Sequence, residues 1–258
     1  MKIINLLTLL LLFVEFLSVK FCNAQHSGIV EYRLITNLSF NYQTTAVLKI
    51  HKKQSHYLVL KSNSLPNELT ITSESNNINI LAPESKHRPA IYMDFNSKNL
   101  FSFVPMFQKN NILYEKLPKI EWQIIDEFKT LNKLNCQKAI GYFRGRTYSV
   151  WFSNDIPLPF GPWKLSGLPG LILEAKDDKN QVYFGAFKIS FKDNIVIDNF
   201  PNEKEAIPLK EFVTETIPIK FKELESLINS KTDRHTTFSL SLPNRYHQEE
   251  IIYEWEEN

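Results

Sequence analysis

The sequence predicts a mainly β protein built on an antiparallel sheet, with one or two short helices near the C-terminus. Short runs in which apolar and polar residues alternate dominate the chain, which is the pattern of half-buried strands. Polar turn clusters separate these runs at the spacing of hairpins, and apolar residues at helical spacing are confined to the C-terminal part. No internal repeat or clear linker interrupts the chain, so we expect one domain.

The N-terminal residues 1–24 have the pattern of a secretory signal peptide. Lys2 supplies the positive start, an apolar run follows, and Cys22 and Ala24 place small residues before a cleavage site at Gln25. An uncleaved N-terminal anchor is one alternative, although the run is short for a membrane span. A lipid anchor on Cys22 is another, which the residues before it do not favour. We therefore expect an exported domain of residues 25–258 without a transmembrane segment.

Composition excludes several classes of protein. The formal net charge of the 258 residues is +2, so the chain has no electrostatic footprint for nucleic acid. Of the two cysteines, only Cys136 remains after cleavage, so no internal disulfide can form. We expect Cys136 to be a buried small side chain, with a reactive thiol as the alternative.

Runs typical of strands fill most of the chain before the helical part. Pro118 interrupts the pattern once, between the last two runs of the first group, and polar clusters form the other turns. The first group comprises residues 28–35, 46–50, 56–61, 89–95, 100–104, 112–117 and 120–125, with weaker strands near 69–72 and 78–81.

Two hairpins are the clearest elements of the second group. Residues 136–143 and 147–152 flank the turn Arg144-Gly145-Arg146, and we expect Ile140 and Tyr142 to share a face with Tyr148 and Val150. Residues 170–175 and 182–191 form the second hairpin around a turn in which we expect Asp177 and Asp178 to be in solvent.

The C-terminal part carries the helical signal. Phe221, Leu224, Leu227 and Ile228 recur at helical spacing, which predicts a helix over residues 219–230. A shorter helix over 209–214 and a short strand over 238–242 are also expected, and the chain ends in an acidic segment.

Between the two hairpins lies a connection rich in proline, glycine and apolar residues, within residues 151–175. It is too apolar for a free loop and too rich in proline for a strand or helix, so we expect a rigid, packed connection. Residues 168–171 fit a type II turn with positive φ at Gly170, followed by the apolar run 171–173, buried on both faces. The motif is therefore first interpreted as a folding device. It comprises Gly167, Leu168, Pro169, Gly170, Leu171 and Ile172.

Those six residues match the signature of the GLPGLI family, and the resemblance extends over residues 133–189. Further anchors occur in the family's order, namely Cys136-Gln137-Lys138-Ala139, Gly145-Arg146, Trp151-Phe152, Ile156-Pro157 and Gly161-Pro162. Members are exported proteins of Gram-negative Bacteroidota with undefined function, and they look related to the bowl-shaped N-terminal module of a bacterial peptide N-glycosidase. The resemblance implies a strongly curved antiparallel sheet, a half-barrel or bowl. It also implies the periplasm or cell surface as location and an outer-membrane or other envelope protein as a partner.

The sequence offers binding residues but no catalytic set. Common hydrolase, phosphate-binding and dinucleotide-binding motifs are absent, so no catalytic residue, metal site or cofactor is predicted. His51 and His56 bracket a turn and could share a metal, but two exposed turn residues are the plainer interpretation. The candidate binding residues are Arg144, Arg146, Trp151, Phe160, Trp163 and Glu174.

Each candidate has a structural alternative. Arg144 and Arg146 bind an anionic ligand, pair with Glu174, or sit in a solvated turn, which we favour. Phe160 and Trp163 either enter the core or stay on the rim of the sheet, and burial is favoured because exported proteins tolerate few large apolar patches.

Two classes of function therefore stay open. The first is a non-catalytic envelope protein that binds a partner protein or an amphipathic ligand in its curved sheet. The alternative is a hydrolase, or a helper module of one, acting on peptide or glycan. A hydrolase would need two acidic or nucleophilic residues converging in one pocket. A purely structural role is the remaining possibility.

Overall fold

The computed structural model of the chain describes most of the residues that follow the predicted signal peptide, and residues 1–24 lie outside it. None of the described helices has the length and apolar character needed to cross a bilayer. The described residues are 27–38, 41–60, 70–74, 77–81, 88–106, 109–192, 195–197, 200–231, 239–240, 242, 245 and 249–256.

The protein is mainly β, as the alternation predicts. In chain order the strands are β1 (Ser27–Asn37), β2 (Asn41–His51), β3 (Gln54–Val59), β4 (Thr70–Glu74), β5 (Asn77–Leu81), β6 (Ala90–Asp94), β7 (Asn99–Met106), β8 (Lys109–Lys116), β9 (Trp122–Leu131), β10 (Leu134–Phe143), β11 (Arg146–Ser153), β12 (Leu171–Asp177), β13 (Val182–Phe191) and β14 (Ile207–Pro208).

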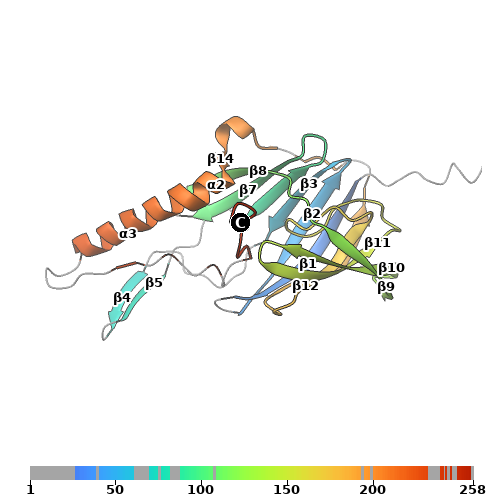
Figure 1. Cartoon of the computed structure of the whole chain (residues 1–258), viewed down its shortest axis with the longest axis horizontal. Coiled ribbons are helices and arrows are strands. Elements are labelled where there is room, and N and C mark those ends of the chain that lie inside the picture. Colours follow the sequence, from blue (N-terminus) through green and yellow to red (C-terminus); the bar gives the residue numbers. More distant parts are fainter. Residues whose placement is uncertain are drawn as a thin grey trace, which may run out of the picture.

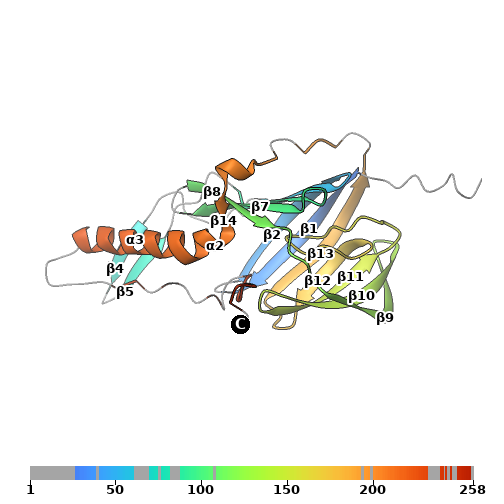
Figure 2. The same ribbon diagram turned by 45° about the horizontal axis from the view of Figure 1, so that its top comes forward.

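Within the described residues, one sheet contains twelve strands in the order β14-β8-β7-β6-β3-β2-β1-β13-β12-β11-β10-β9, and β4 and β5 form a separate pair. All neighbours in the large sheet run antiparallel except β14, which pairs in parallel with β8. The sheet is strongly bent: the long strands β1, β2 and β13 form its middle, with β7 and β8 on one side and β9 to β11 on the other (Figures 1 and 2). The curved sheet implied by the family resemblance is thus present.

The inner face of this sheet forms the main core. One cross-strand row runs over five strands from β1 to β10, and every member is buried. A second row runs from β2 to β8 on the same face. Strand residues alternate between faces, so these rows carry the apolar half of each strand. The first row is Leu34, Phe184, Ala175, Val150 and Ala139. The second is Leu48, Tyr57, Ile91, Ser102 and Leu113.

The outer face of β3, β6 and β7 has a smaller core of its own. Tyr92 pairs with His56 on β3 and Phe101 on β7, and Phe200 packs edge-on against Tyr92 and Phe101. The chain after β13 therefore covers this part of the outer face. His56 stacks on Tyr92 with ring centroids 4.1 Å apart, and burial, with Lys49, lowers its pKa to about 4.

The helices follow β14, which joins the edge of the sheet beside β8. A 3₁₀ turn η1 (Glu203–Glu205) precedes it, and α2 (Leu209–Glu211), the π-helical segment η2 (Phe212–Thr216) and α3 (Ile217–Lys231) run on without a break. The two helices expected over 209–214 and 219–230 are thus one continuous helical stretch. Its α3 part points away from the sheet (Figures 1 and 2). The strand expected over 238–242 is wrong for residues 239, 240 and 242, and its other residues lie outside the described part.

The proline-rich connection, residues 154–170, is packed inside the curved sheet, as expected. Ile156, Leu158, Phe160, Leu165 and Leu168 are each at most 4% exposed and belong to the main core. The following run 171–173 is buried on both faces, also as expected. The predicted type II turn is wrong, however, because the described glycines with positive φ are Gly145 and Gly167, and Gly170 is not among them.

The hairpin of β10 and β11 has a shorter turn than expected, and this changes the faces of its residues. Phe143 pairs with Arg146, so Gly141 faces Tyr148 and Ala139 faces Val150. Ile140 and Tyr142 consequently lie on the outer face, where Tyr142 is 51% exposed, and the predicted match with Tyr148 and Val150 is wrong.

Candidate functional site

A pocket of about 610 Å³ lies on the inner face, in the half of the sheet that the proline-rich connection does not fill. Most of its wall is apolar. Tyr57, Ile91, Ser102 and Leu113 form its floor, since they belong to one row across β3, β6, β7 and β8. Pockets of this size accommodate drug-sized ligands.

The helical stretch closes one side of the pocket. Leu209, Phe212, Val213 and Ile217 line it, and Leu209 and Phe212 pack with Leu113 of β8. The parallel pairing of Ile207 with Leu113 fixes where this stretch begins. A short sequence, Ile207-Pro208-Leu209, thus turns the chain from the sheet edge into a helix that presents its apolar side to the pocket.

The last described segment, residues 249–256, lies over the same pocket and contributes Glu249, Glu250 and Tyr253 to its wall. The backbone N–H of Ile251 donates to the carbonyl of Arg144, which holds this C-terminal segment against the β10–β11 turn. Figure 1 places the C-terminus over the sheet, between its two sides.

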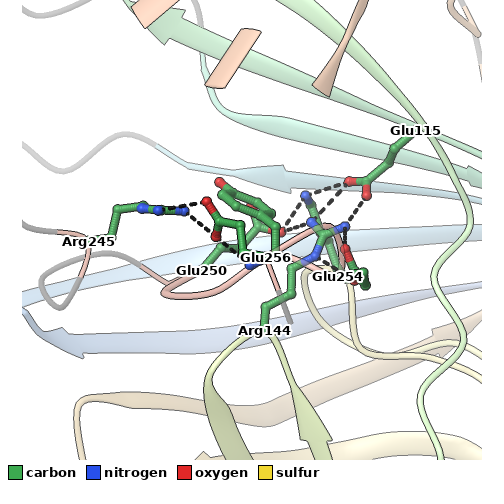
Figure 3. Close-up of polar contacts among 8 residues, drawn as sticks. Glu115, Arg144, Arg245, Glu250, Glu254 and Glu256 are labelled. Carbon is green, nitrogen blue, oxygen red and sulfur yellow. Dashed lines mark hydrogen bonds and ion pairs between the residues drawn. The ribbon is translucent and has the colours of Figure 1, made fainter. Parts of the chain in front are cut away.

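Arg144 anchors the C-terminal segment through an ion-pair network. Its side chain is 2% exposed, and its guanidinium group pairs with Glu115 of β8, with Glu250 and with Glu254 (Figure 3). Lys164 of the proline-rich connection joins the same network, with its Nζ atom 2.7 Å from Glu115 and 2.8 Å from Glu250. Four separate parts of the chain, namely β8, the β10–β11 turn, the proline-rich connection and the C-terminal segment, are therefore joined by ion pairs at this end of the pocket.

The pKa values of the network follow from burial and pairing. Burial alone would raise the pKa of Glu250, but the nearby Lys164 and Arg144 outweigh it and hold this pKa below its usual range. Burial opposes the charge of Arg144, yet Glu250 and Glu115 raise its pKa still further above the ordinary value. The pairing therefore keeps both Glu250 and Arg144 charged near neutral pH.

Arg146 forms a second buried pair, which corrects two expectations. Its Nη1 atom lies 2.5 Å from Asp177 and 2.8 Å from the Gln181 side chain, and its Nε donates to the Glu249 carbonyl. Asp177 also accepts from the backbone N–H groups of Gln181 and Val182. Asp177 is therefore buried, whereas Asp178 is exposed as expected.

Neither arginine lies in a solvated turn, and Arg144 and Arg146 do not pair with Glu174. The two-residue turn and the strand register send both side chains toward the C-terminal segment, about 100 residues away in the sequence. The sequence predicts a longer, exposed turn, and it does not indicate that the C-terminal segment packs against this turn.

Glu174 and Trp151 lie on the opposite, outer face, where they are neighbours on β12 and β11. Lys129 of β9 bridges them: its Nζ is 2.7 Å from Glu174 and 4.4 Å from the centre of the Trp151 ring. These partly exposed residues form a surface ion pair and a cation–π contact, and they do not belong to the pocket.

The two aromatic candidates of the connection have different positions. Phe160 is fully buried and packs edge-on against Phe95, as favoured. Trp163 is only partly buried: it packs against Phe143 of the core and also lines the pocket. It has φ of 55°, a left-handed conformation at the point where the connection turns back.

Sequence reasoning missed the polar residues of the pocket. The acidic ending of the chain is the only sequence signal for Glu249 and Glu250, and no sequence pattern distinguishes Lys164 within the connection. Among the described residues, the hydroxyl groups of Tyr57 and Ser102 have no hydrogen-bond partner although both are buried. Such orphaned buried groups call for a partner.

The described residues include no cluster of three or more histidine, cysteine or acidic side chains that could hold a metal ion. His51 accepts from or donates to the Ser27 hydroxyl at 2.9 Å, and His56 stacks on Tyr92. Both are partly buried, so the picture of two exposed turn residues is wrong. Cys136 is buried as expected, and burial raises the pKa of its thiol.

The fold resembles solved structures at low sequence identity. PNGF-II in space group C2 superposes with a TM-score of 0.50 and 13% identity over 74% of this chain and 33% of that chain. An uncharacterized conserved protein from Thermus thermophilus gives 0.38 at 9% identity, covering 71% of this chain and 91% of that one. A LolA superfamily protein from Nitrosomonas europaea gives 0.27 at 12%, covering 70% and 92%.

The likeness to PNGF-II concerns the fold alone, and this chain spans about a third of that protein's length. The other two TM-scores are too low to support a conclusion. No protein-family model and no curated protein sequence matches the chain.

Proposed function

We propose that this chain is a non-catalytic binding protein that holds a small amphipathic molecule in the pocket on its inner face. The pocket carries this proposal: about 610 Å³ of space with a predominantly apolar wall and polar groups at one end. Burial of apolar surface supplies most of the free energy of such binding, and the few polar groups orient the ligand.

The wall residues support a ligand with a long apolar body. The sheet and the helical stretch both contribute apolar side chains to the pocket wall, among them Leu34, Val59, Leu113, Phe212 and Ile217. An apolar ligand would give these side chains dispersion contacts on the side that faces the pocket. A partner protein of the envelope is the other possibility raised by the sequence, and it is less favoured because the C-terminal segment contributes to the wall of this pocket.

We further propose that the protein is exported to the cell envelope of a Gram-negative bacterium and belongs with the GLPGLI proteins. The support is the N-terminal pattern of residues 1–24 and the motif of residues 167–172. Intact mass of the protein from its native host tests the export. We expect a chain beginning at Gln25, and a mass that includes residues 1–24, or a lipid on Cys22, contradicts this.

Native purification followed by organic extraction and mass spectrometry tests the binding. We expect an amphipathic small molecule to co-purify with the parent protein. Val59→Trp should fill the pocket from β3 and abolish co-purification, because Val59 lines the pocket. Ile124→Trp is the control, since Ile124 is 48% exposed on β9. Equal recovery from both variants, or none from the parent in any growth condition, contradicts the proposal.

One observation keeps a hydrolase as a second candidate. Glu249 and Glu250 both line the pocket, and burial raises the pKa of Glu249 while Lys164 and Arg144 lower that of Glu250. A carboxyl group with a raised pKa beside one with a lowered pKa resembles the pair of a glycosidase.

Binding is nevertheless the better-supported function. Glu250 is already held by Arg144 and Lys164, so its carboxylate is not free to attack a substrate or activate water. The wall is also poor in the polar groups that would hold a sugar or a peptide. Glycan or peptide cleavage by the parent that disappears in Glu249→Gln would favour the hydrolase.

A further inference from the structure

The polar groups of the pocket gather where the C-terminal segment meets the sheet, and most of them are hydrogen-bond acceptors. Glu249 reaches this place from the C-terminal segment, and Tyr57 from β3. Both side chains line the same pocket, and burial together with the negative charge of Glu249 raises the pKa of Tyr57. Within the described part of the chain, no other side chain forms a hydrogen bond or ion pair with the Glu249 carboxylate. Its own backbone N–H donates to it, and Arg146 and Lys164 act on it only through their charge.

The cations at this end are already occupied. Arg144 directs all five of its N–H groups at Glu115, Glu250 and Glu254. Lys164 uses two of its three donors for Glu115 and Glu250. Arg146 is neutralised by Asp177. An anionic head group would therefore meet one remaining lysine donor and several carboxylates.

The local balance of charge is negative. Two cations, Arg144 and Lys164, face a larger set of carboxylates at this end of the pocket. These carboxylates belong to Glu115, Glu249, Glu250 and Glu254. A cation placed among them gains more than it would in water, because the surroundings are partly desolvated.

We propose that the ligand is an alkyl or similar apolar chain that ends in a primary ammonium group, with the ammonium bound to the Glu249 carboxylate and the Tyr57 hydroxyl oxygen. This inference rests on the proposed binding function and specifies its ligand class. An ammonium supplies three donors and a positive charge, which complement the carboxylate oxygens of Glu249 and the hydroxyl oxygen of Tyr57. Ser102, whose hydroxyl group is also unpartnered, lies two strands away on the same row and lines the pocket.

Calorimetric titration of the full mature chain with probes of equal chain length tests the head group. The probes are decylammonium, decanol and decanoate, each below the concentration at which it forms micelles. We expect decylammonium to bind at least about tenfold more tightly than decanol, and decanoate to bind most weakly, because only the ammonium compensates a partly desolvated carboxylate.

Two variants locate the effect. Glu249→Gln should remove the advantage of decylammonium over decanol and leave decanol binding unchanged. Tyr57→Phe keeps the ring and should weaken decylammonium binding by about threefold to tenfold through the loss of one hydrogen bond. Glu121→Gln is the control for the change in net charge, because its side chain is 81% exposed and outside the pocket.

The outcomes separate this inference from the proposed function. If the three probes bind alike, or decanoate binds best, while Val59→Trp abolishes binding, the pocket binds ligands but the ammonium specificity is wrong. If Glu249→Gln keeps the preference for decylammonium, the assigned carboxylate is wrong. If no probe binds the parent protein, both the binding function and its ligand class are contradicted.

Discussion

Gly167 and Gly170 are glycines for different physical reasons. Gly167 has φ of +96°, and a Cβ atom there would have open space, with Trp122 as its nearest neighbour at 3.9 Å. At Gly170, a Cβ atom would lie 2.1 Å from the carbonyl oxygen of Ser153. The second glycine of the motif therefore serves the close approach of two backbone segments, and the first serves the turn.

We predict that Gly170→Ala destabilises the protein more than Gly167→Ala. The first change forces two backbone segments apart, which costs about 2–3 kcal/mol or more. The second adds only backbone strain, about 1–2 kcal/mol. Urea denaturation of both variants gives the two free energies of unfolding. If Gly167→Ala were the more destabilising change, the close contact with Ser153 would not be the reason that position 170 requires glycine.

The contribution of Glu249 to the stability of the folded protein should depend on pH. Burial raises the pKa of Glu249 above its ordinary value of 4.5, so the folded state binds this proton more tightly than the unfolded chain. Its contribution to stability is therefore complete at low pH and is lost as the pH rises through the raised pKa.

Glu249→Gln should consequently raise the melting temperature relative to the parent at pH 7, and this gain should vanish near pH 4. Thermal unfolding at both values checks the sign, with Glu121→Gln as the exposed control. A variant that melts lower than the parent at pH 7 would show that the ionised carboxylate has a stabilising partner.

At the scale of elements, the C-terminal segment and the proline-rich connection shape the pocket together. Arg144 and Lys164 bring both to Glu115 of β8, and this places a charged layer beside an apolar wall. A buried ion pair adds little net stability when it forms, but the loss of one partner leaves the remaining charges buried without compensation.

We predict that Arg144→Met costs about 3–5 kcal/mol of stability, because Glu115 and Glu250 would remain buried with only Lys164. Arg245→Met is the matched control. Arg245 pairs with Glu256 near the surface, at 37% and 28% side-chain exposure, so its loss should cost below about 1 kcal/mol.

Chemical denaturation of the two variants measures the difference. Similar losses in both would mean that the network around Arg144 is no stronger than a surface pair. Limited proteolysis adds a structural readout, since release of the C-terminal segment in Arg144→Met should make residues near 249–256 cleavable before the sheet.

On the scale of the whole molecule, the inner face of the bent sheet is divided into a packed half and a half that contains the pocket. The half near β9 to β13 is filled by the proline-rich connection, whereas the half near β3 to β8 leaves the pocket open beneath the helices and the C-terminal segment. A ligand in this pocket contacts several elements at once and should therefore stabilise the folded state as a unit.

Accordingly, decylammonium at a free concentration of 100 times its Kd should add about 2.7 kcal/mol to the free energy of unfolding. For a domain of this size, that corresponds to a rise of about 5–10 °C in Tm. Differential scanning calorimetry measures it, and Val59→Trp should show no rise. An equal rise in that variant would place the ligand elsewhere.

Much of the fold follows from the sequence because its signals are local. Alternation predicts the strands from β1 to β13, and helical spacing predicts α3, since each pattern reflects which side of one element faces the core. The burial of residues 171–173, Phe160 and Cys136 follows from composition in the same way. The register between β10 and β11 does not follow from these local signals. The turn between them is one residue shorter than expected, and this places Ile140 and Tyr142 on the outer face.

The pocket and its charges were decided by the tertiary structure alone. Arg144 and Arg146 look like solvated turn residues until the C-terminal segment, about 100 residues later, returns to pair with them. Glu115 and Lys164 likewise carry no local signal, and the acidic ending of the chain does not reveal the partners of Glu250, because an ion pair between distant elements depends on the path of the chain. By itself the sequence determined the strands, the helix and the packed connection; only the folding of the bent sheet determined which polar groups share its inner face.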